Sequence, residues 1–243
     1  GAEPLFYNLS DATNWQPNFE ALESLDLTDV KIMWVNYPHM PTGTDATLKT
    51  FEKLIAFGKK HNILIINDNP YSFILNDNPI SILQVEGAKD IALELNSLSK
   101  TFNMAGWRVG MLLGNATFIN EVLKVKSNMD SGMFYGIQKG AIEALQLSDE
   151  WFSKQNKIYE ERRKLIWQLA DKLDATYSKN ATGLFVWAKI PEGKKSEEVT
   201  DAVLYDNDIF ITPGTIFGSQ GEGYIRFSLC VTEEVIKEAI SRL

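Results

Sequence analysis

The chain has 243 residues, of which 44% are hydrophobic and 11% aromatic, a composition typical of a globular protein with one large domain or one and a half ordinary ones. A formal net charge of −8 excludes a global positive field that would attract nucleic acid or an acidic membrane surface. One cysteine and two histidines are too few for a disulfide scaffold or a zinc site, and no run of about 18 apolar residues could cross a bilayer. These counts predict a protein of the reducing cytoplasm that contacts neither nucleic acid nor membrane.

The first half of the chain alternates short β-branched runs with longer amphipathic segments. This alternation predicts an α/β fold in which strands joined by crossover helices form a mainly parallel sheet. The segment 45–62 is predicted to be a helix with Leu48, Phe51, Leu54 and Ile55 on its apolar face. The predicted strands are KIMWVNY (31–37), ILIIND (63–68), IALELN (91–96) and WRVGMLLG (107–114).

The second half of the chain is mainly helical at first and then mixes strands with helices. A polar-faced segment that begins at Asp149 exceeds the usual length of a globular helix, so it is predicted to connect two lobes. Residues 1–148 are therefore predicted to form the α/β lobe, and residues 149–243, including the long helix, a small α+β lobe. Further helices are predicted over 116–129, 136–147, 196–207 and 232–243, and strands over 181–190 and 223–229.

Asp68 ends the apolar run of a predicted strand, where open α/β sheets place their ligand crevice. A buried carboxylate at this point is costly unless it meets a cation, and a protonated pyridine nitrogen would be such a partner. Tyr71, three residues later, could donate its phenol proton to a ring oxygen. The alternative is an Asx-type turn capped by Asp68 before Pro70, with Tyr71 packed in the core.

Lys100 is predicted to lie in the loop after the strand 91–96, at the same sheet edge as Asp68. A neutral lysine amine can attack a carbonyl carbon and form a Schiff base, although most lysines are only solvated surface residues. Ser97, Ser99 and Arg108 supply two hydroxyl groups and a guanidinium within one loop and the start of the next strand, which suits a phosphate monoester. For Arg108 the alternative is an ordinary salt bridge to a carboxylate.

Arg226 interrupts the apolar strand GYIRFSL (223–229). An arginine in such a strand either points outward to solvent or points into a cleft, where it can bind a carboxylate in a bidentate manner. The preceding TPGTIFGSQGEG (212–223) is rich in glycine but lacks the strand-then-helix context of a phosphate loop.

Four segments resemble, in the order of the family, the fold-type I pyridoxal phosphate enzymes and among them the class I/II aminotransferases of the aspartate aminotransferase superfamily. They are NYPHMPTG (36–43), NDNPYSF (67–73), SLSKTFNMAGWRVG (97–110) and GYIRFSL. The resemblance covers nearly the whole chain. It implies that residues 1–148 are part of the pyridoxal-phosphate-binding large domain and that residues 149–243 are the small domain.

The resemblance also implies a role for each candidate residue and a chemistry for the protein. Lys100 would bond covalently to pyridoxal 5′-phosphate, Asp68 would pair with its pyridine nitrogen, and Tyr71 would bond its ring hydroxyl. Ser97, Ser99 and Arg108 would bind the phosphate, and Arg226 the substrate α-carboxylate. The implied activity is transfer of an amino group between an amino acid and a 2-oxo acid by a homodimer, with no metal.

Two departures from the family pattern qualify this expectation. Met40 stands where the family normally has an asparagine that donates to the cofactor's ring hydroxyl, and a methionine cannot donate this bond. The family is also longer at its amino end, where it supplies part of the phosphate cradle and an aromatic residue on the pyridine ring. The chain is therefore expected to be a fragment that binds the cofactor weakly or not at all and has weak or no activity.

Two other functions stay open at this stage. A pyridoxal-phosphate-dependent carbon–sulfur β-lyase acting on cystathionine-like substrates would use the same lysine, aspartate and arginine, and His39 before the turn is compatible with it. NDNPY argues against it, because those lyases more often carry an acidic residue and histidine there. A non-catalytic, aminotransferase-like sensor domain is the second alternative, although no basic recognition helix occurs in the chain.

Overall fold

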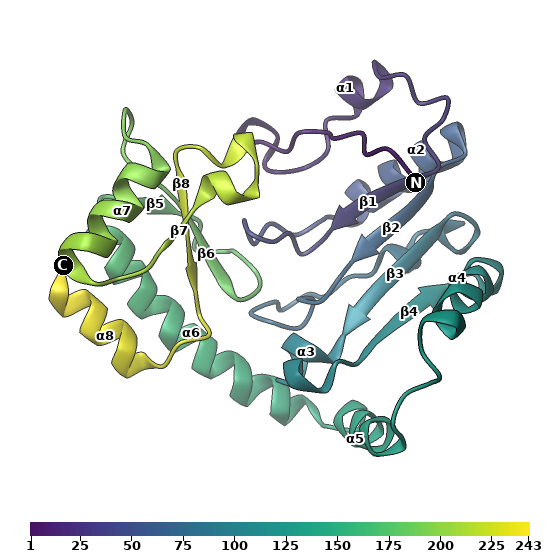
Figure 1. Cartoon of the computed structure of the whole chain (residues 1–243). Helices are drawn as coiled ribbons and strands as arrows, with labels where there is room; N and C mark the ends of the chain where they lie inside the picture. Colours follow the sequence, from purple (N-terminus) through teal and green to yellow (C-terminus); the bar gives the residue numbers. More distant parts are fainter. The chain divides into compact units, whose positions relative to one another are not determined.

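A four-stranded sheet organises the first half of the chain in the computed structural model, which describes residues 1–243 (Figure 1). The strands lie in the order β1 (Ile32–Asn36), β2 (Leu64–Asp68), β3 (Ala92–Ser97) and β4 (Gly110–Gly114). Neighbours β1, β2 and β3 are parallel, and β4 runs antiparallel to β3. The predicted α/β class with a mainly parallel sheet is therefore confirmed.

Helix α2 (Leu48–His61) connects β1 to β2 and begins at Thr47, whose hydroxyl accepts a hydrogen bond from the Thr50 amide. Phe51, Leu54 and Ile55 are buried as predicted, but Leu48 is exposed, because it lies in the first turn at the edge of the apolar face. No α-helix connects β2 to β3. The crossover there contains only the short turns η2 (Ile82–Gln84) and η3 (Ala88–Asp90), consistent with two prolines and several turn-forming residues in that segment.

The segment between β3 and β4 differs from the sequence prediction in two ways. Lys100 lies in a one-turn helix, α3 (Leu98–Thr101), and not in a loop, because the Ser97 hydroxyl caps that turn. Trp107 and Arg108 do not begin a strand. Trp107 ends the short turn η4 (Ala105–Trp107), and Arg108 adopts a left-handed conformation with φ 55°, which ends the turn before β4 begins at Gly110.

A second sheet, entirely antiparallel, organises the C-terminal part of the chain in the order β5-β6-β8-β7. Its strands are β5 (Thr176–Tyr177), β6 (Phe185–Lys189), β7 (Thr212–Pro213) and β8 (Tyr224–Ser228). The remaining helices are α1 (Phe19–Glu23), α4 (Ala116–Met129), α5 (Tyr135–Leu145), α6 (Asp149–Asp171), α7 (Ser196–Asn207) and α8 (Glu233–Arg242), with short turns η1 (Asp11–Thr13), η5 (Gly214–Phe217) and η6 (Ser219–Gly221). None of the helices combines the length and the apolar character needed to span a bilayer. Residues 1–10 pair with neither sheet and form no strand.

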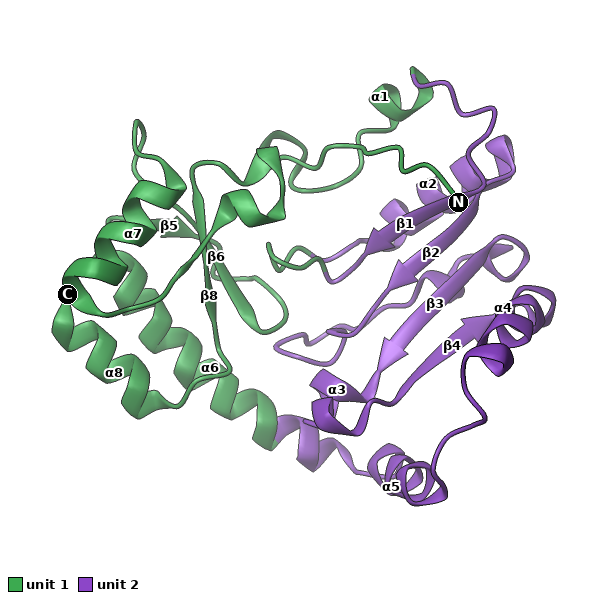
Figure 2. Ribbon diagram, viewed as in Figure 1, with its two compact units in different colours: residues 1–24, 39–44, 154–243 green, residues 25–38, 45–153 purple.

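The chain divides into two compact units (Figure 2). Unit 1 comprises residues 1–24, 39–44 and 154–243, and unit 2 comprises residues 25–38 and 45–153. The sequence predicted a single cut between residues 148 and 149, so the two divisions differ for residues 1–24, 39–44 and 149–153. The predicted domain boundary stays a prediction, and the compact units are a separate, observed division.

Aromatic packing explains why the first residues belong to unit 1. The ring of Trp15 lies edge-on to Trp187 and Tyr224, with centroid distances of 6.0 and 5.4 Å. The carbonyl oxygen of Gly43, which has φ +70°, accepts a 2.8 Å hydrogen bond from the Thr182 amide. A Cβ atom at Gly43 would lie 2.7 Å from that of Ala181, so only glycine allows this close approach.

A buried carboxylate joins the strands of unit 2. Glu94, 4% exposed, accepts hydrogen bonds from Asn67 Nδ2 at 3.1 Å and from the Ile82 amide at 3.2 Å. Asn67 in turn bonds the backbone of Tyr37 in both directions, at 3.0 and 3.3 Å. This network therefore ties the chain just after β1, at Tyr37, to the residue of β2 that directly precedes Asp68.

We expect Glu94→Ala to lower the free energy of unfolding by about 2 kcal/mol, because two buried donors lose their acceptor. Glu94→Gln retains an acceptor oxygen and nearly the same volume, so its loss should be smaller, about 1 kcal/mol or less. Urea unfolding monitored by circular dichroism measures both values. Equal losses for the two variants would contradict a role for the hydrogen bonds and would indicate a packing effect alone.

Candidate functional site

Asp68 lies at the carboxyl end of β2, directly beside β3. It pairs in register with Leu95, and Asn36 Nδ2 donates a 2.6 Å hydrogen bond to the Asp68 carbonyl oxygen. The residue as a whole is exposed, but neighbouring protein atoms partly desolvate its carboxyl group and raise the pKa of Asp68 above its ordinary value. A cation at this carboxylate would offset the desolvation.

The loop after Asp68 is held against β3 by its backbone. The Asn69 amide donates to the Leu95 carbonyl oxygen at 2.8 Å, and Asn96 Nδ2 donates to the Asn69 carbonyl oxygen at 2.9 Å. In this turn the Ser72 hydroxyl donates to Asn69 Oδ1 at 2.5 Å, a bond between two side chains, and the Asx-type turn capped by Asp68 is not found. Tyr71 is 8% exposed.

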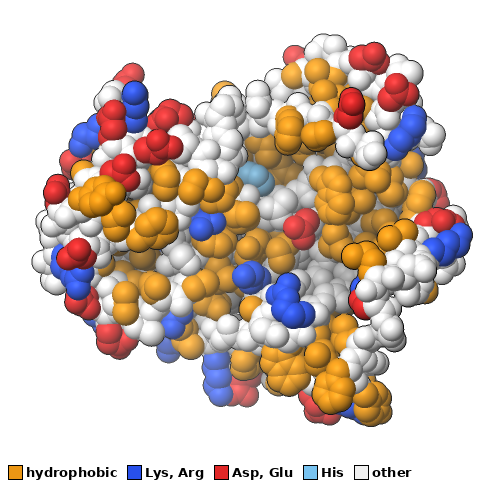
Figure 3. Space-filling view, viewed as in Figure 1, with side chains coloured by type: hydrophobic (Ala, Val, Ile, Leu, Met, Phe, Trp, Pro, Cys, Tyr) orange, Lys and Arg blue, Asp and Glu red, His pale blue; other side chains and the backbone are white.

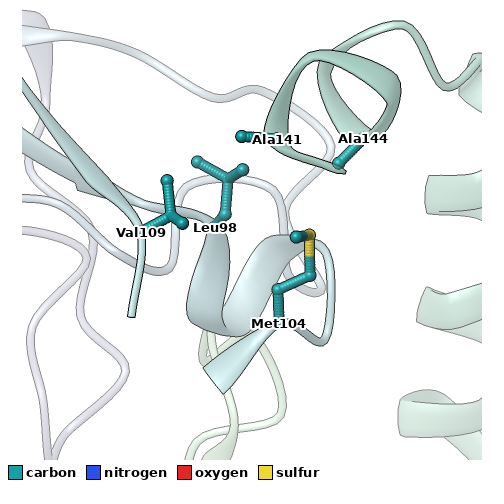
Figure 4. Packing of buried hydrophobic residues seen from close by; sticks show 5 residues of the cluster. All are labelled: Leu98, Met104, Val109, Ala141 and Ala144. Carbon is teal, nitrogen blue, oxygen red and sulfur yellow. The ribbon is translucent and has the colours of Figure 1, made fainter. Parts of the chain in front are cut away.

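Lys100 follows β3 immediately, in the single turn of α3. The Ser97 hydroxyl accepts a hydrogen bond from the Ser99 amide at 3.1 Å and begins this turn. Ser97, Ser99 and Lys100 are all half-buried. Figure 4 shows the buried side of α3, where Leu98 points toward Ala141 of α5. Because Leu98 packs against α5, it anchors the buried side of the turn that carries Lys100.

Arg108 lies beside the start of α3. The Leu98 amide and the Ser97 hydroxyl donate to the Val109 carbonyl oxygen, at 3.1 and 3.4 Å, so the residue after Arg108 bonds the segment that carries the serines. The exposed Arg108 guanidinium donates from Nη1 to the Ala105 carbonyl oxygen at 2.7 Å and forms no ion pair. The alternative of a salt bridge to a carboxylate is therefore not found.

Arg226 lies on β8 in unit 1, half-buried between aromatic rings. Its guanidinium carbon is 4.3 Å from the ring centroid of Phe185 and 4.8 Å from that of Phe217. Its Nη1 donates to the sulfur of Met40 at 3.6 Å. The two aromatic faces and the thioether contact the guanidinium group. The Arg226 side chain therefore does not simply point outward to solvent.

The structure thus brings six of the predicted site residues together in unit 2, at the ends of the adjacent strands β2 and β3 and just before β4. They are Asp68, Tyr71, Ser97, Ser99, Lys100 and Arg108. Arg226 belongs to unit 1. Sequence reasoning missed Asn36 and Phe217 as neighbours of the site residues. For Phe217, the sequence offered one indication of a role near Arg226: an aromatic residue inside the glycine-rich segment 212–223.

The whole sequence, residues 1–243, matches the family profile described as aminotransferase class I and II. The chain belongs to this aminotransferase family. Among curated proteins, it is 40% identical over 246 residues to the LL-diaminopimelate aminotransferase of Maridesulfovibrio salexigens and 39% identical over 245 residues to that of Aquifex aeolicus. Both matches cover 100% of this chain and 63% of the relative, so the chain spans less than two thirds of the length of these aminotransferases.

Solved aminotransferase-fold structures agree with the sequence relatives. Apo-BacF from Bacillus subtilis superposes with a TM-score of 0.90 at 36% identity, covering 96% of this chain and 60% of that one. An aminotransferase from Staphylococcus aureus gives a TM-score of 0.88 at 32% identity, covering 97% of this chain and 62% of the other. The fold described above is therefore that of the family.

Class I and II aminotransferases use pyridoxal 5′-phosphate, which combines a pyridine ring, a ring hydroxyl, an aldehyde and a phosphate. The donor set of unit 2 fits this group. The amine of Lys100 and the hydroxyl of Ser99 have no hydrogen-bond partner within the protein, and the desolvated carboxyl of Asp68 pairs with no cation. The residues that would hold the group are Lys100, Asp68, Tyr71, Ser97, Ser99 and Arg108.

The raised pKa of Asp68 predicts a pH-dependent cost to stability. The folded chain binds this proton more tightly than the unfolded chain, whose carboxyl keeps its ordinary pKa near 3.8, so the free energy of unfolding falls as pH rises from 3.8 through the folded pKa. Asp68→Asn removes this cost, and the variant should gain stability relative to the parent between pH 4 and pH 7. Urea unfolding of both proteins at the two pH values measures the gain. An unchanged difference would contradict the desolvation of Asp68.

Proposed function

We propose that the protein is a pyridoxal-phosphate-dependent aminotransferase that moves an amino group between an amino acid and a 2-oxo acid. The observation that carries the proposal is the pairing of Asp68 with Leu95, which sets the carboxylate at the end of the strand next to the one that leads into Lys100. The amine of Lys100 suits the aldehyde of the cofactor, and the desolvated carboxylate of Asp68 suits its protonated pyridine nitrogen. The two residues follow neighbouring strands, so they can act on opposite ends of one ring.

Each residue has a distinct task in this proposal. When bound, the cofactor supplies an electron sink for the pair released at the substrate α-carbon. The Nζ atom of Lys100 accepts the α-proton as a general base. The carboxylate of Asp68 holds the proton on the pyridine nitrogen, and Tyr71 donates to the ring hydroxyl oxygen. Arg226 binds the α-carboxylate through two parallel hydrogen bonds, which fixes the orientation of the α-carbon.

Ser97, Ser99 and Arg108 bind the phosphate in this proposal. The Arg108 guanidinium retains donors besides the one used on Ala105, and the Ser99 hydroxyl is unused within the protein. The Ser97 hydroxyl already caps α3 and would contribute mainly by holding the turn. Met40 cannot donate a hydrogen bond to the ring hydroxyl of the cofactor. Its sulfur contacts Arg226, the proposed carboxylate-binding residue.

We further propose a homodimer in the cytoplasm, without nucleic acid or membrane as a partner. The support is the apolar surface of α4 and α5, where Leu123 and Val125 are 56% and 64% exposed and Phe134, just before α5, is 76% exposed. Figure 3 shows apolar side chains, in orange, at the lower edge of the view where α5 lies. Exposed patches of this kind usually mark interaction surfaces. Sedimentation velocity would test the dimer, and a monomer at micromolar concentration would contradict it.

An amino-transfer assay tests the proposed activity. The names of the relatives make LL-diaminopimelate the first amino donor to try, with 2-oxoglutarate as acceptor and excess pyridoxal 5′-phosphate. Glutamate formation that requires the acceptor supports the proposal. Pyruvate release from cystathionine without an acceptor would instead indicate the β-lyase, and no turnover of any donor in a protein that binds the cofactor would favour the sensor domain.

A further inference from the structure

Helix α3 is too short to fix Lys100 by itself. It has four residues, a single turn, and such a turn is not stable without tertiary contacts. At its C-terminal end the Phe102 and Met104 amides both donate to the Leu98 carbonyl oxygen, at 3.1 and 3.3 Å. The Thr101 carbonyl oxygen, one residue after Lys100, receives no such backbone bond and needs another donor.

The first turn of α6 supplies this donor. Trp151 Nε1 donates to the Thr101 carbonyl oxygen at 3.2 Å across a sequence separation of 50 residues. Thr101 is 4% exposed, so water does not readily replace the indole. Trp151 itself is half-buried. The turn that carries Lys100 is therefore closed by a side chain from a distant helix.

Phe152, the next residue of α6, contacts both halves of the site in unit 2. Its ring lies 5.7 Å from that of Phe102, edge-on at 62°, and 5.5 Å from that of Phe73, tilted by 31°. Phe102 follows Lys100 by two residues, and Phe73 follows Tyr71 by two residues. One ring thus contacts the Lys100 turn and the loop that begins at Asp68.

The opposite side of α3 is held independently. Leu98, Met104 and Val109 pack against Ala141 and Ala144 of α5 (Figure 4). This cluster fixes the inner face of the turn but contains no residue of the loop after Asp68. The α6 contacts join that loop to the Lys100 turn through the ring of Phe152.

We infer that Trp151 and Phe152 are positioning residues that hold the Lys100 turn in register with the Asp68–Tyr71 loop. The inference rests on the function proposed above, in which Lys100 and Asp68 act on opposite ends of one rigid ring. Displacements of about 1 Å at such a pair are costly, because the reacting atoms must be aligned. Trp151 and Phe152 touch neither substrate nor cofactor in this scheme and act through Thr101, Phe102 and Phe73.

Three variants test the inference. Trp151→Phe keeps the ring and removes the indole N–H, and Phe152→Leu keeps apolar volume and removes the ring. Trp167→Phe is the matched control, because Trp167 lies on the same helix and its buried Nε1 has no hydrogen-bond partner to lose. Urea unfolding of each variant shows whether the chain as a whole stays folded.

The first readout is the rate at which borohydride fixes pyridoxal 5′-phosphate on Lys100, with the other lysines of the same digest as internal reference. We expect Trp151→Phe and Phe152→Leu to lower the Lys100 rate about fivefold to tenfold and to leave the other lysines unchanged, whereas Trp167→Phe matches the parent. A merely structural role would change all lysines together with the unfolding midpoint. Parent-like rates at Lys100 in both folded variants would overturn the inference and leave the proposed function intact.

The second readout needs no cofactor. Amide hydrogen exchange at Phe102 and Met104, whose bonds close the Lys100 turn, should accelerate about tenfold in Trp151→Phe and not in Trp167→Phe. If the parent attaches no pyridoxal 5′-phosphate at Lys100, it behaves as the fragment without cofactor binding that the sequence predicts, and this exchange measurement still decides the positioning role. Unchanged exchange in Trp151→Phe would overturn it.

Discussion

Replacement of Lys100 by arginine is expected to abolish the covalent attachment of pyridoxal 5′-phosphate to the site in unit 2. The attachment needs a neutral primary amine, and a guanidinium stays protonated and does not form the bond. Arginine keeps the positive charge and a similar length at this half-buried position, so binding through charge alone would survive the change. The expected effect is complete loss of the Lys100 adduct, with unfolding free energy within about 0.5 kcal/mol of the parent.

Borohydride reduction followed by peptide mass spectrometry measures this loss. The reduction is irreversible, so it records even a weak complex at excess cofactor. Lys124→Arg is the control, because Lys124 is an exposed residue of α4 whose amine pairs with Glu121 at 2.6 Å. This control should leave the Lys100 adduct unchanged. A parent chain in which the adduct is spread evenly over exposed lysines would contradict the assignment of Lys100.

The strands of unit 2 were largely predictable, whereas the short elements around them were not. Runs such as 63–68 and 91–96 are rich in isoleucine, leucine or alanine and form β2 and β3 close to the expected positions. The turn α3 is too short for any helical periodicity, so Lys100 was expected in a loop. The grouping of residues 1–24 with unit 1 depends on Trp15 packing against residues more than 170 positions away, and no local pattern signals such a contact.

The candidate site shows the same division between local and distant information. Asp68 and Lys100 could be placed at one sheet edge because strand ends and their following residues are local features of the sequence. The Trp151 indole on the Thr101 carbonyl oxygen and the thioether of Met40 on Arg226 join residues 50 and 186 positions apart. Such contacts follow from packing of the whole chain, so reading segments one at a time could not predict them.

Substitution of Arg226 is expected to have the second large effect, on the affinity for a substrate carboxylate. Arg226→Lys should weaken binding of 2-oxoglutarate about 100-fold, or about 3 kcal/mol, because an ammonium replaces two parallel hydrogen bonds by one point charge. The aromatic faces of Phe185 and Phe217, 4.3 and 4.8 Å from the guanidinium carbon, fit a planar group and give a compact ammonium less contact. Isothermal titration calorimetry measures the dissociation constant.

A second arginine of unit 1 separates the specific effect at Arg226 from a general effect of replacing a guanidinium by an ammonium. Arg242 on α8 is exposed and pairs with Glu238 at 2.6 Å, so Arg242→Lys should change the affinity by less than about 0.5 kcal/mol. Met40→Leu removes the sulfur that accepts from Arg226 Nη1 at 3.6 Å and keeps the apolar volume. If this thioether orients the guanidinium, Met40→Leu should weaken binding about threefold, between the two arginine variants. Equal affinities in Arg226→Lys and Arg242→Lys would show that the carboxylate binds elsewhere, since net charge is the same in both.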